Sequence, residues 1–216
     1  MANKKKISAS KILTWYMEYV VAQQSKPESI AAFSEMHNFS DEEFYSHFTS
    51  FKDIEKDIYL LLFENSVAIL KQTPEFTSFS KKDKLLSLYY TLFENLSLNQ
   101  EFIKFNLKGF ENQLKALSIF SRFKRSFLLF IDELDLETFN LNVDVIENMQ
   151  HKTIKESSWI QLLFTIKFWL DDTSEAYEKT DIFIEKSLNT SFELLNTKSL
   201  NNIIDLAKFL YKEKVK

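Results

Sequence analysis

The chain has 216 residues, of which 45% are hydrophobic and 27% are charged, and its formal net charge is −4. This is the composition of a globular protein long enough to bury a sizeable core, and its negative charge gives no general attraction to nucleic acid. The absence of cysteine excludes disulfides, thiolate nucleophiles and zinc fingers, while one glycine and two prolines are too few for a turn-rich sheet protein. An all-α fold is therefore predicted.

The first residues combine a basic head with an apolar stretch that Glu18 interrupts, and no small-residue cleavage site follows. A signal peptide is therefore not expected, and no apolar run is long enough to span a bilayer. We expect a cytoplasmic protein.

Three short helices are predicted in the first 50 residues. Ser10 can cap a helix that runs to about Gln24, and Pro27 suits the first turn of a second helix that ends near His37. Asn38 tolerates the left-handed backbone that often ends a helix. This part of the chain is expected to form a small head, residues 1–50.

The third helix begins with a recognisable sequence signal. Ser40 is followed three residues later by Glu43, which is the spacing of a capping box. The apolar face of this helix is expected to consist of Phe44, Tyr45 and Phe48.

Longer helices are predicted for the body, residues 51–216, at 50–72, 80–96, 111–134, 143–155, 157–172, 174–195 and 200–212, with a shorter one capped by Asn99. The periodic residues of the first are Ile54, Ile58, Leu61, Leu62, Asn65 and Ile69. The segment 157–172 is apolar on almost every side, which is typical of a helix buried on two sides.

The stretch FSEMHNFSDEEFYSHFTSF, residues 33–51, resembles the helix-turn-helix of the TetR family of bacterial transcription regulators. The family motif reads roughly I-A-x-x-A-G-V-S-x-x-x-L-Y-x-Y-F-x-S-K. The residues at its defined positions include Phe33, Ser34, Asn38, Phe39, Ser40, Phe44, Tyr45, His47 and Phe48. The resemblance implies a DNA-binding head, a helical body that binds a ligand, and a homodimer.

The resemblance and the basic N-terminal arm together give a set of candidate DNA contacts: Lys4, Lys5, Lys6, Lys11, Ser40, Tyr45, His47 and Lys52. Several features oppose DNA binding. Asp41, Glu42 and Glu43 occupy the first turn of the recognition helix, and Phe51 replaces a usual phosphate-contacting lysine. Residues 28–56 contain seven acids and two bases, which repel a polyanion. Whether the operator-binding function is retained is left open.

Fifteen per cent of the chain is aromatic, which predicts an apolar ligand if the body has a pocket. The candidate lining residues are Phe63, Tyr89, Phe93, Phe102, Phe105, Phe120, Phe123, Phe127, Trp159 and Phe164. Arg122, Lys124 and Arg125 can hold an acidic group at its mouth, or form a solvated face. By the resemblance, the last helices pair across a dimer, with interface candidates Ile160, Leu163, Ile166, Trp169, Leu170, Ile184 and Leu188.

The alternative is a TetR-fold protein that has lost DNA binding and carries a hydrophobic, lipid-like ligand. The amphipathic segment 200–212 carries lysines that suit an anionic membrane surface, although packing of this segment on the body is the favoured interpretation. We expect no enzyme, no cofactor and no metal site. The three histidines lack metal-ligand spacing, and no glycine-rich phosphate loop exists.

Overall fold

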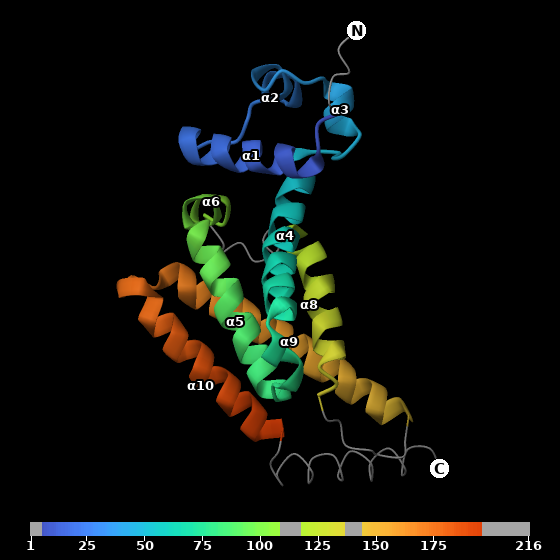
Figure 1. Ribbon diagram of the computed structural model, residues 1–216, viewed down its shortest axis with the longest axis vertical. Helices are drawn as coiled ribbons and strands as arrows, with labels where there is room; N and C mark the ends of the chain where they lie inside the picture. Colours follow the sequence, from blue (N-terminus) through green and yellow to red (C-terminus); the bar gives the residue numbers. More distant parts are fainter. Residues whose placement is uncertain (1–5, 109–117, 137–143, 196–216) are drawn as a thin grey trace. The chain divides into compact units, whose positions relative to one another are not determined.

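The computed structural model describes residues 6–108, 118–136 and 144–195 (Figure 1). All regular structure within these residues is helical and no strand occurs there, which confirms the all-α prediction. The chain packs as two compact units, one formed by Met1–Ala68 with Leu92–Ser126 and the other by Ile69–Thr91 with Phe127–Lys216. The division into a head and a body after residue 50 stays a prediction.

The head contains α1 (Ala9–Gln23), α2 (Ile30–Met36) and α3 (Asp41–Tyr45). Two predicted helix starts were wrong. The N-cap of α1 is Ser8, whose side chain accepts a hydrogen bond from the Lys11 amide, so Ser10 lies inside the first turn. The second helix begins at Ile30 rather than at Pro27, because Ser29 caps it by accepting from the Ala32 amide.

The turn between α2 and α3 has the predicted form. Asn38 adopts a left-handed backbone with φ of 57°. The Ser40 side chain accepts from the Glu43 amide, and the Glu43 carboxylate accepts from the Ser40 amide at 3.1 Å, which confirms the capping box. Phe44 and Phe48 are buried as expected, whereas the Tyr45 side chain is 58% exposed.

The first unit continues through α4 (Phe51–Gln72) to α6 (Gln100–Asn106) and the start of α8 (Ser121–Glu133). The predicted buried face of α4 was half wrong. Leu61 and Ile69 are 38% and 50% exposed, and Asn65 is exposed as well. The buried stripe instead runs through Ile54, Glu55, Ile58, Tyr59, Leu62, Phe63, Ser66 and Leu70.

The second unit contains the 3₁₀ turn η1 (Pro74–Ser78), most of α5 (Lys81–Leu98), the end of α8, α9 (Asp144–Asp171) and α10 (Glu178–Leu195). Two predicted helices, 143–155 and 157–172, form the single helix α9. The serines at the expected break are accommodated, because the Ser158 hydroxyl donates to the Ile154 carbonyl one turn earlier at 2.8 Å.

The segment between α9 and α10 holds a sharp turn, so the predicted helix 174–195 begins later, at Glu178. The 3₁₀ turn η2 (Glu175–Tyr177) includes Ala176 with φ of 49°. Asp172 organises this turn, because its carboxylate accepts from the backbone amides and hydroxyls of Ser174 and Thr180 at 2.6–2.9 Å. Although burial opposes the effect, these hydrogen bonds lower the pKa of Asp172.

Candidate functional site

The outer surface of the head carries most of the candidate DNA contacts. Lys6, Lys11, Ser40, Tyr45, His47 and Lys52 are all exposed, while Lys4 and Lys5 lie outside the described residues. The Tyr45 ring stands beside the buried Phe44, with ring centroids 5.7 Å apart, so its hydroxyl is available at the surface. A tyrosine in this position can donate to a phosphate oxygen.

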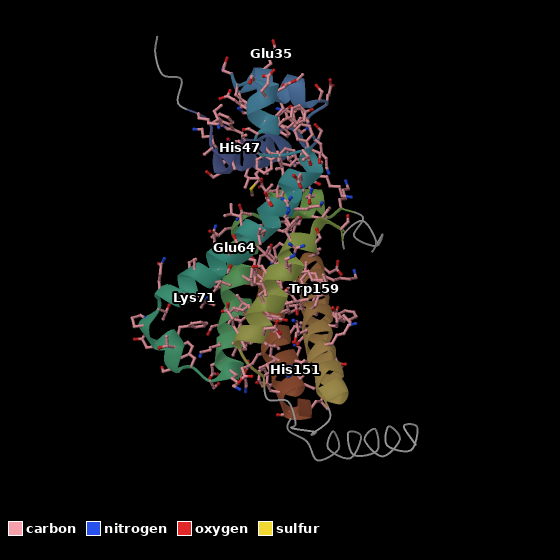
Figure 2. The ribbon with its side chains drawn as sticks, turned by 90° about the vertical axis from the view of Figure 1, so that its right-hand side faces the viewer. Glu35, His47, Glu64, Lys71, His151 and Trp159 are labelled. Carbon is pink, nitrogen blue, oxygen red and sulfur yellow. The ribbon has the colours of Figure 1, made fainter. Side chains whose placement is uncertain are left out.

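His47 has a structural partner that the sequence did not reveal. Its Nε2 atom donates to the carbonyl oxygen of Ile7 at 2.8 Å, and Figure 2 labels His47 in the head. This bond holds the Ile7 backbone against the turn that follows α3. Lys11 lies nearby on α1, with its Nζ atom 5.2 Å from the centre of the Trp15 ring.

The seven acids counted against DNA binding in residues 28–56 are not equivalent. Glu43 is part of the capping box, whereas Glu42 is exposed, and hydrogen bonding with the Ser40 side chain lowers the pKa of Glu42. Asp53 forms an ion pair with Arg122 at 2.6 Å, and Glu55 is 2% exposed and paired with Lys26. Two of the seven acids counted against DNA are therefore neutralised by bases outside the counted segment.

The ion pairs of Arg122 also show whether this residue is free to hold the acidic group of a ligand. Its guanidinium is engaged by Asp53 and Asp57 of α4, so it holds α8 against α4 within the first unit. In this arrangement Arg122 is committed to an internal ion pair rather than to an acidic ligand.

The candidate ligand-lining residues are mostly core. Phe63, Tyr89, Phe93, Phe102, Phe120, Phe123, Phe127 and Trp159 are all at most 3% exposed, Phe105 is half-buried, and Phe164 is 63% exposed. In the first unit, Phe63 and Phe120 both contact the Phe123 ring, at centroid distances of 5.2 and 5.9 Å, and Phe120 stands edge-on to Tyr59. In the second unit, Phe127 packs on Trp159, which Figure 2 labels on α9.

The candidate dimer residues divide into two groups. Ile166, Trp169, Ile184 and Leu188 are at most 2% exposed, so they belong to the core that α9 and α10 share. Leu163 and Leu170 are half-buried, and Ile160 is 51% exposed. Three further exposed apolar residues of α9 and α10 were not predicted as interface residues: Phe168 and Ile182 were not candidates, and Phe164 was placed among the ligand-lining residues. The spacing of four residues between Ile160, Phe164 and Phe168 along α9 was the available signal.

An open apolar groove of about 580 Å³ lies on this surface between α9 and α10. It is lined by Phe168, Ile182 and Phe183 with Lys179 and Lys186 at its edge, and the Phe168 and Phe183 rings stack at 4.6 Å. Across the described residues, no helix is long and apolar enough to cross a membrane, and no three potential ligands cluster to hold a metal ion. The segment 200–212 lies outside the described residues.

A helix-turn-helix followed by a long helix and further helices is an architecture found in one class of transcription regulators. Residues 84–210, more than half of the chain, match the family model described as the tetracyclin repressor-like C-terminal domain. The chain therefore belongs to the TetR family. No curated protein and no solved structure gives a significant match to the chain.

Proposed function

We propose that the protein is a homodimeric transcription regulator that binds an operator through α3 and responds to an apolar small molecule in its helical body. The family match to the C-terminal body carries the proposal, and the head supports it. The α2–α3 turn has the helix-turn-helix form, with Tyr45 and Lys52 exposed and the packing residues Phe44 and Phe48 buried. An α3 placed in this way can enter the major groove.

The acidic first turn of α3 shapes the expected mode of DNA binding. Glu43 is used in the capping box, which leaves Asp41 and Glu42 to face DNA. Carboxylates accept hydrogen bonds from cytosine amino groups, so the operator is expected to present cytosines to these two side chains. Phosphate contacts are expected to come from Tyr45, Lys52 and the lysines of the N-terminal arm, and the His47–Ile7 bond keeps residue 7 close to the end of α3.

The exposed apolar surface of α9 and α10 supports the dimer. Ile160, Phe164 and Phe168 recur at four-residue intervals and form one stripe along α9, and Ile182 adds to it from α10. A symmetric dimer would bury this surface on both copies, with the α9–α10 pair of each chain contributing to a four-helix bundle. We refer to these four residues as the dimer stripe.

The aromatic cluster of the first unit supports a ligand with an apolar body. The rings of Tyr59, Phe63, Phe120 and Phe123 pack on one another. Aromatic side chains of this kind commonly line the binding sites of apolar ligands. With Arg122 committed to Asp53 and Asp57, the ligand is expected to be held mainly by apolar contacts.

A selection experiment tests the proposal without knowledge of the operator. Purified protein is used to enrich duplexes from a random library over several rounds at low salt, beside Tyr45→Ala and the control Met36→Ala, whose side chain is also exposed in the head. The proposal predicts an enriched motif with two-fold symmetry for the wild type and Met36→Ala, and a weaker enrichment for Tyr45→Ala. Enrichment of no motif by the wild type would contradict it.

A further inference from the structure

One histidine of the head is packed between aromatic rings at the point where α2 ends. His37 is the C-cap residue of α2, and the next residue, Asn38, takes the left-handed backbone of the turn. The His37 ring stacks on the Trp15 ring of α1 with centroids 4.5 Å apart, and it stands edge-on to Phe33 of α2 at 4.9 Å. Trp15 also stacks on Phe39, which follows Asn38, at 5.7 Å. The His37 side chain is therefore part of the contact that holds the α2–α3 turn against α1.

The two nitrogen atoms of the His37 ring have different surroundings. The Nε2 atom is buried, and no hydrogen-bond partner for it occurs among the described residues, whereas Nδ1 is not enclosed in this way. A neutral imidazole carries one proton and can place it on Nδ1, where it needs no acceptor inside the protein. A protonated imidazole carries a proton on both nitrogens, so protonation creates a buried N–H donor without an acceptor. The packing around His37 therefore accommodates the neutral ring better than the charged one.

The charged groups around His37 act in both directions. Glu18 of α1 favours the protonated ring. Lys11 of the same helix opposes it, because its ammonium already lies 5.2 Å from the centre of the Trp15 ring on which His37 stacks. Burial outweighs the attraction of Glu18 and lowers the pKa of His37. The charged side chains of α2 and α3 are acids that are not buried, so solvent screens them: Glu35, Asp41, Glu42 and Glu43.

We propose that His37 makes the helix-turn-helix sensitive to acid, because protonation of its ring weakens the packing of the α2–α3 turn on α1. The turn is firmly held while His37 is neutral and is loosened once the ring carries a proton. Histidine is the side chain whose ordinary titration falls nearest to physiological pH, so a modest acidification reaches it. The sensitivity itself does not depend on the function proposed above, whereas its effect on operator affinity does.

The direction of the pH dependence follows from the lowered pKa of His37. Above about pH 7.5, His37 is neutral in both the folded and the unfolded chain and contributes no pH dependence. As the pH falls through about 6.5, the unfolded chain binds a proton at His37 before the folded chain does. The free energy of unfolding therefore decreases, and it continues to decrease until the folded protein is protonated as well. A variant without a titratable group at position 37 should lack this part of the loss.

An NMR titration of the imidazole protons on the full chain tests the first step. The chain has three histidines, so the variants His47→Gln and His151→Gln assign the His37 signal by elimination. We expect the titration midpoint of His37 in the folded protein to lie below the midpoint of the histidines in the same protein unfolded by urea. A midpoint equal to or above the unfolded value would overturn the proposal, and this measurement requires no variant at position 37.

Hydrogen exchange followed by mass spectrometry tests whether protonation loosens the turn. Exchange of residues 30–39 is compared at about pH 7.5 and about pH 5.5, after correction for the intrinsic pH dependence of amide exchange. In the wild type, the protection of this segment should fall by more than about twofold at the lower pH. His37→Phe keeps an aromatic ring against Trp15 but has no titratable nitrogen, so the protection should change by less than about twofold.

A second histidine variant is the matched control for this exchange experiment. His151→Gln removes an exposed histidine of α9, labelled in Figure 2, and should show the same acid-induced loss at residues 30–39 as the wild type. Equal losses in the wild type and in His37→Phe would mean that acid acts on the head through another group, and the proposal would then be wrong. The same conclusion would follow if the loss were as large in α9 as in residues 30–39.

Operator binding separates this inference from the proposed function. If the wild type binds an operator, its dissociation constant should rise between about pH 7.5 and about pH 5.5 by a larger factor than that of His37→Phe. Protonation of the exposed acids changes both proteins alike, so the ratio of the two dissociation constants isolates the effect of His37. If the wild type binds no DNA, the proposed function fails, and the titration and exchange experiments still decide the acid sensitivity.

Discussion

Replacing Phe164 tests the proposed dimer stripe at its most exposed member. Burial of a whole phenylalanine side chain contributes about 1.5–3 kcal/mol. Phe164 is 63% exposed in the single chain, so covering it contributes about 1–2 kcal/mol per copy. A two-fold symmetric dimer covers it twice, and Phe164→Ala should therefore weaken the dimer by about 2–4 kcal/mol, or roughly 30- to 1,000-fold in its dissociation constant.

Sedimentation velocity over a range of protein concentrations measures this change directly. Leu129→Ala is the matched control, because Leu129 is 57% exposed on α8 but does not belong to the stripe. The control should leave the dissociation constant within about twofold of the wild type. A wild type that is monomeric at micromolar concentration, or a Phe164→Ala dimer as tight as the wild type, would refute the reasoning.

Three further predictions concern stability and charge. Asp172→Ala should lower the melting temperature by at least about 4 °C, whereas Asp171→Ala, which loses only a surface ion pair, should change it little. Because the pKa of Asp172 is lowered by folding, this difference should be constant above about pH 5 and shrink as the pH falls below about 4. Ser40→Ala should reduce the free energy of unfolding by about 1 kcal/mol in chemical denaturation, and no change would argue against the cap. Glu42→Ala should weaken binding to the selected operator a few-fold, because the carboxylate that accepts from a cytosine amino group is lost, and a tighter complex at low salt would show that Glu42 only repels the DNA.

The head was largely predictable because its signals are local. Ser40 and Glu43 cap the same helix turn, and Asn38 takes the left-handed backbone that its side chain tolerates, so neither depends on distant parts of the chain. The starts of α1 and α2 were predicted wrongly because more than one nearby residue suited each helix start: Ser10 as well as Ser8 for α1, and Pro27 as well as Ser29 for α2. Ser8 and Ser29 are the N-cap residues, because their side chains accept hydrogen bonds from the backbone amides three residues later.

The long helices were predictable in kind but less so in orientation. The stripe of α4 was misread because apolar periodicity favoured Leu61 and Ile69, while Tyr59, Phe63 and Ser66 are the residues that are buried. In α9, apolar residues occur on the buried side of the helix and on its exposed side as well. Periodicity alone therefore does not show which of these residues are buried.

The polar network at Glu55 was beyond sequence reasoning. Its donors Tyr16, Lys26 and Asn106 are 29 to 51 positions away, and nothing in the local sequence distinguishes Glu55 from the exposed Glu42. A charge count treated both as obstacles to DNA. Only the packing of α1, α4 and α6 shows that one of them is buried and internally satisfied.

Binding to the DNA upstream of its own gene, followed by fluorescence anisotropy across a salt series, tests the central claim most directly. A TetR-family regulator with the proposed head should bind this duplex in preference to a shuffled one. Lys52→Ala should reduce the slope of log affinity against log salt concentration by about 1, the contribution of one phosphate contact. Equal affinity for both duplexes, or no binding by the wild type at low salt, would contradict the account.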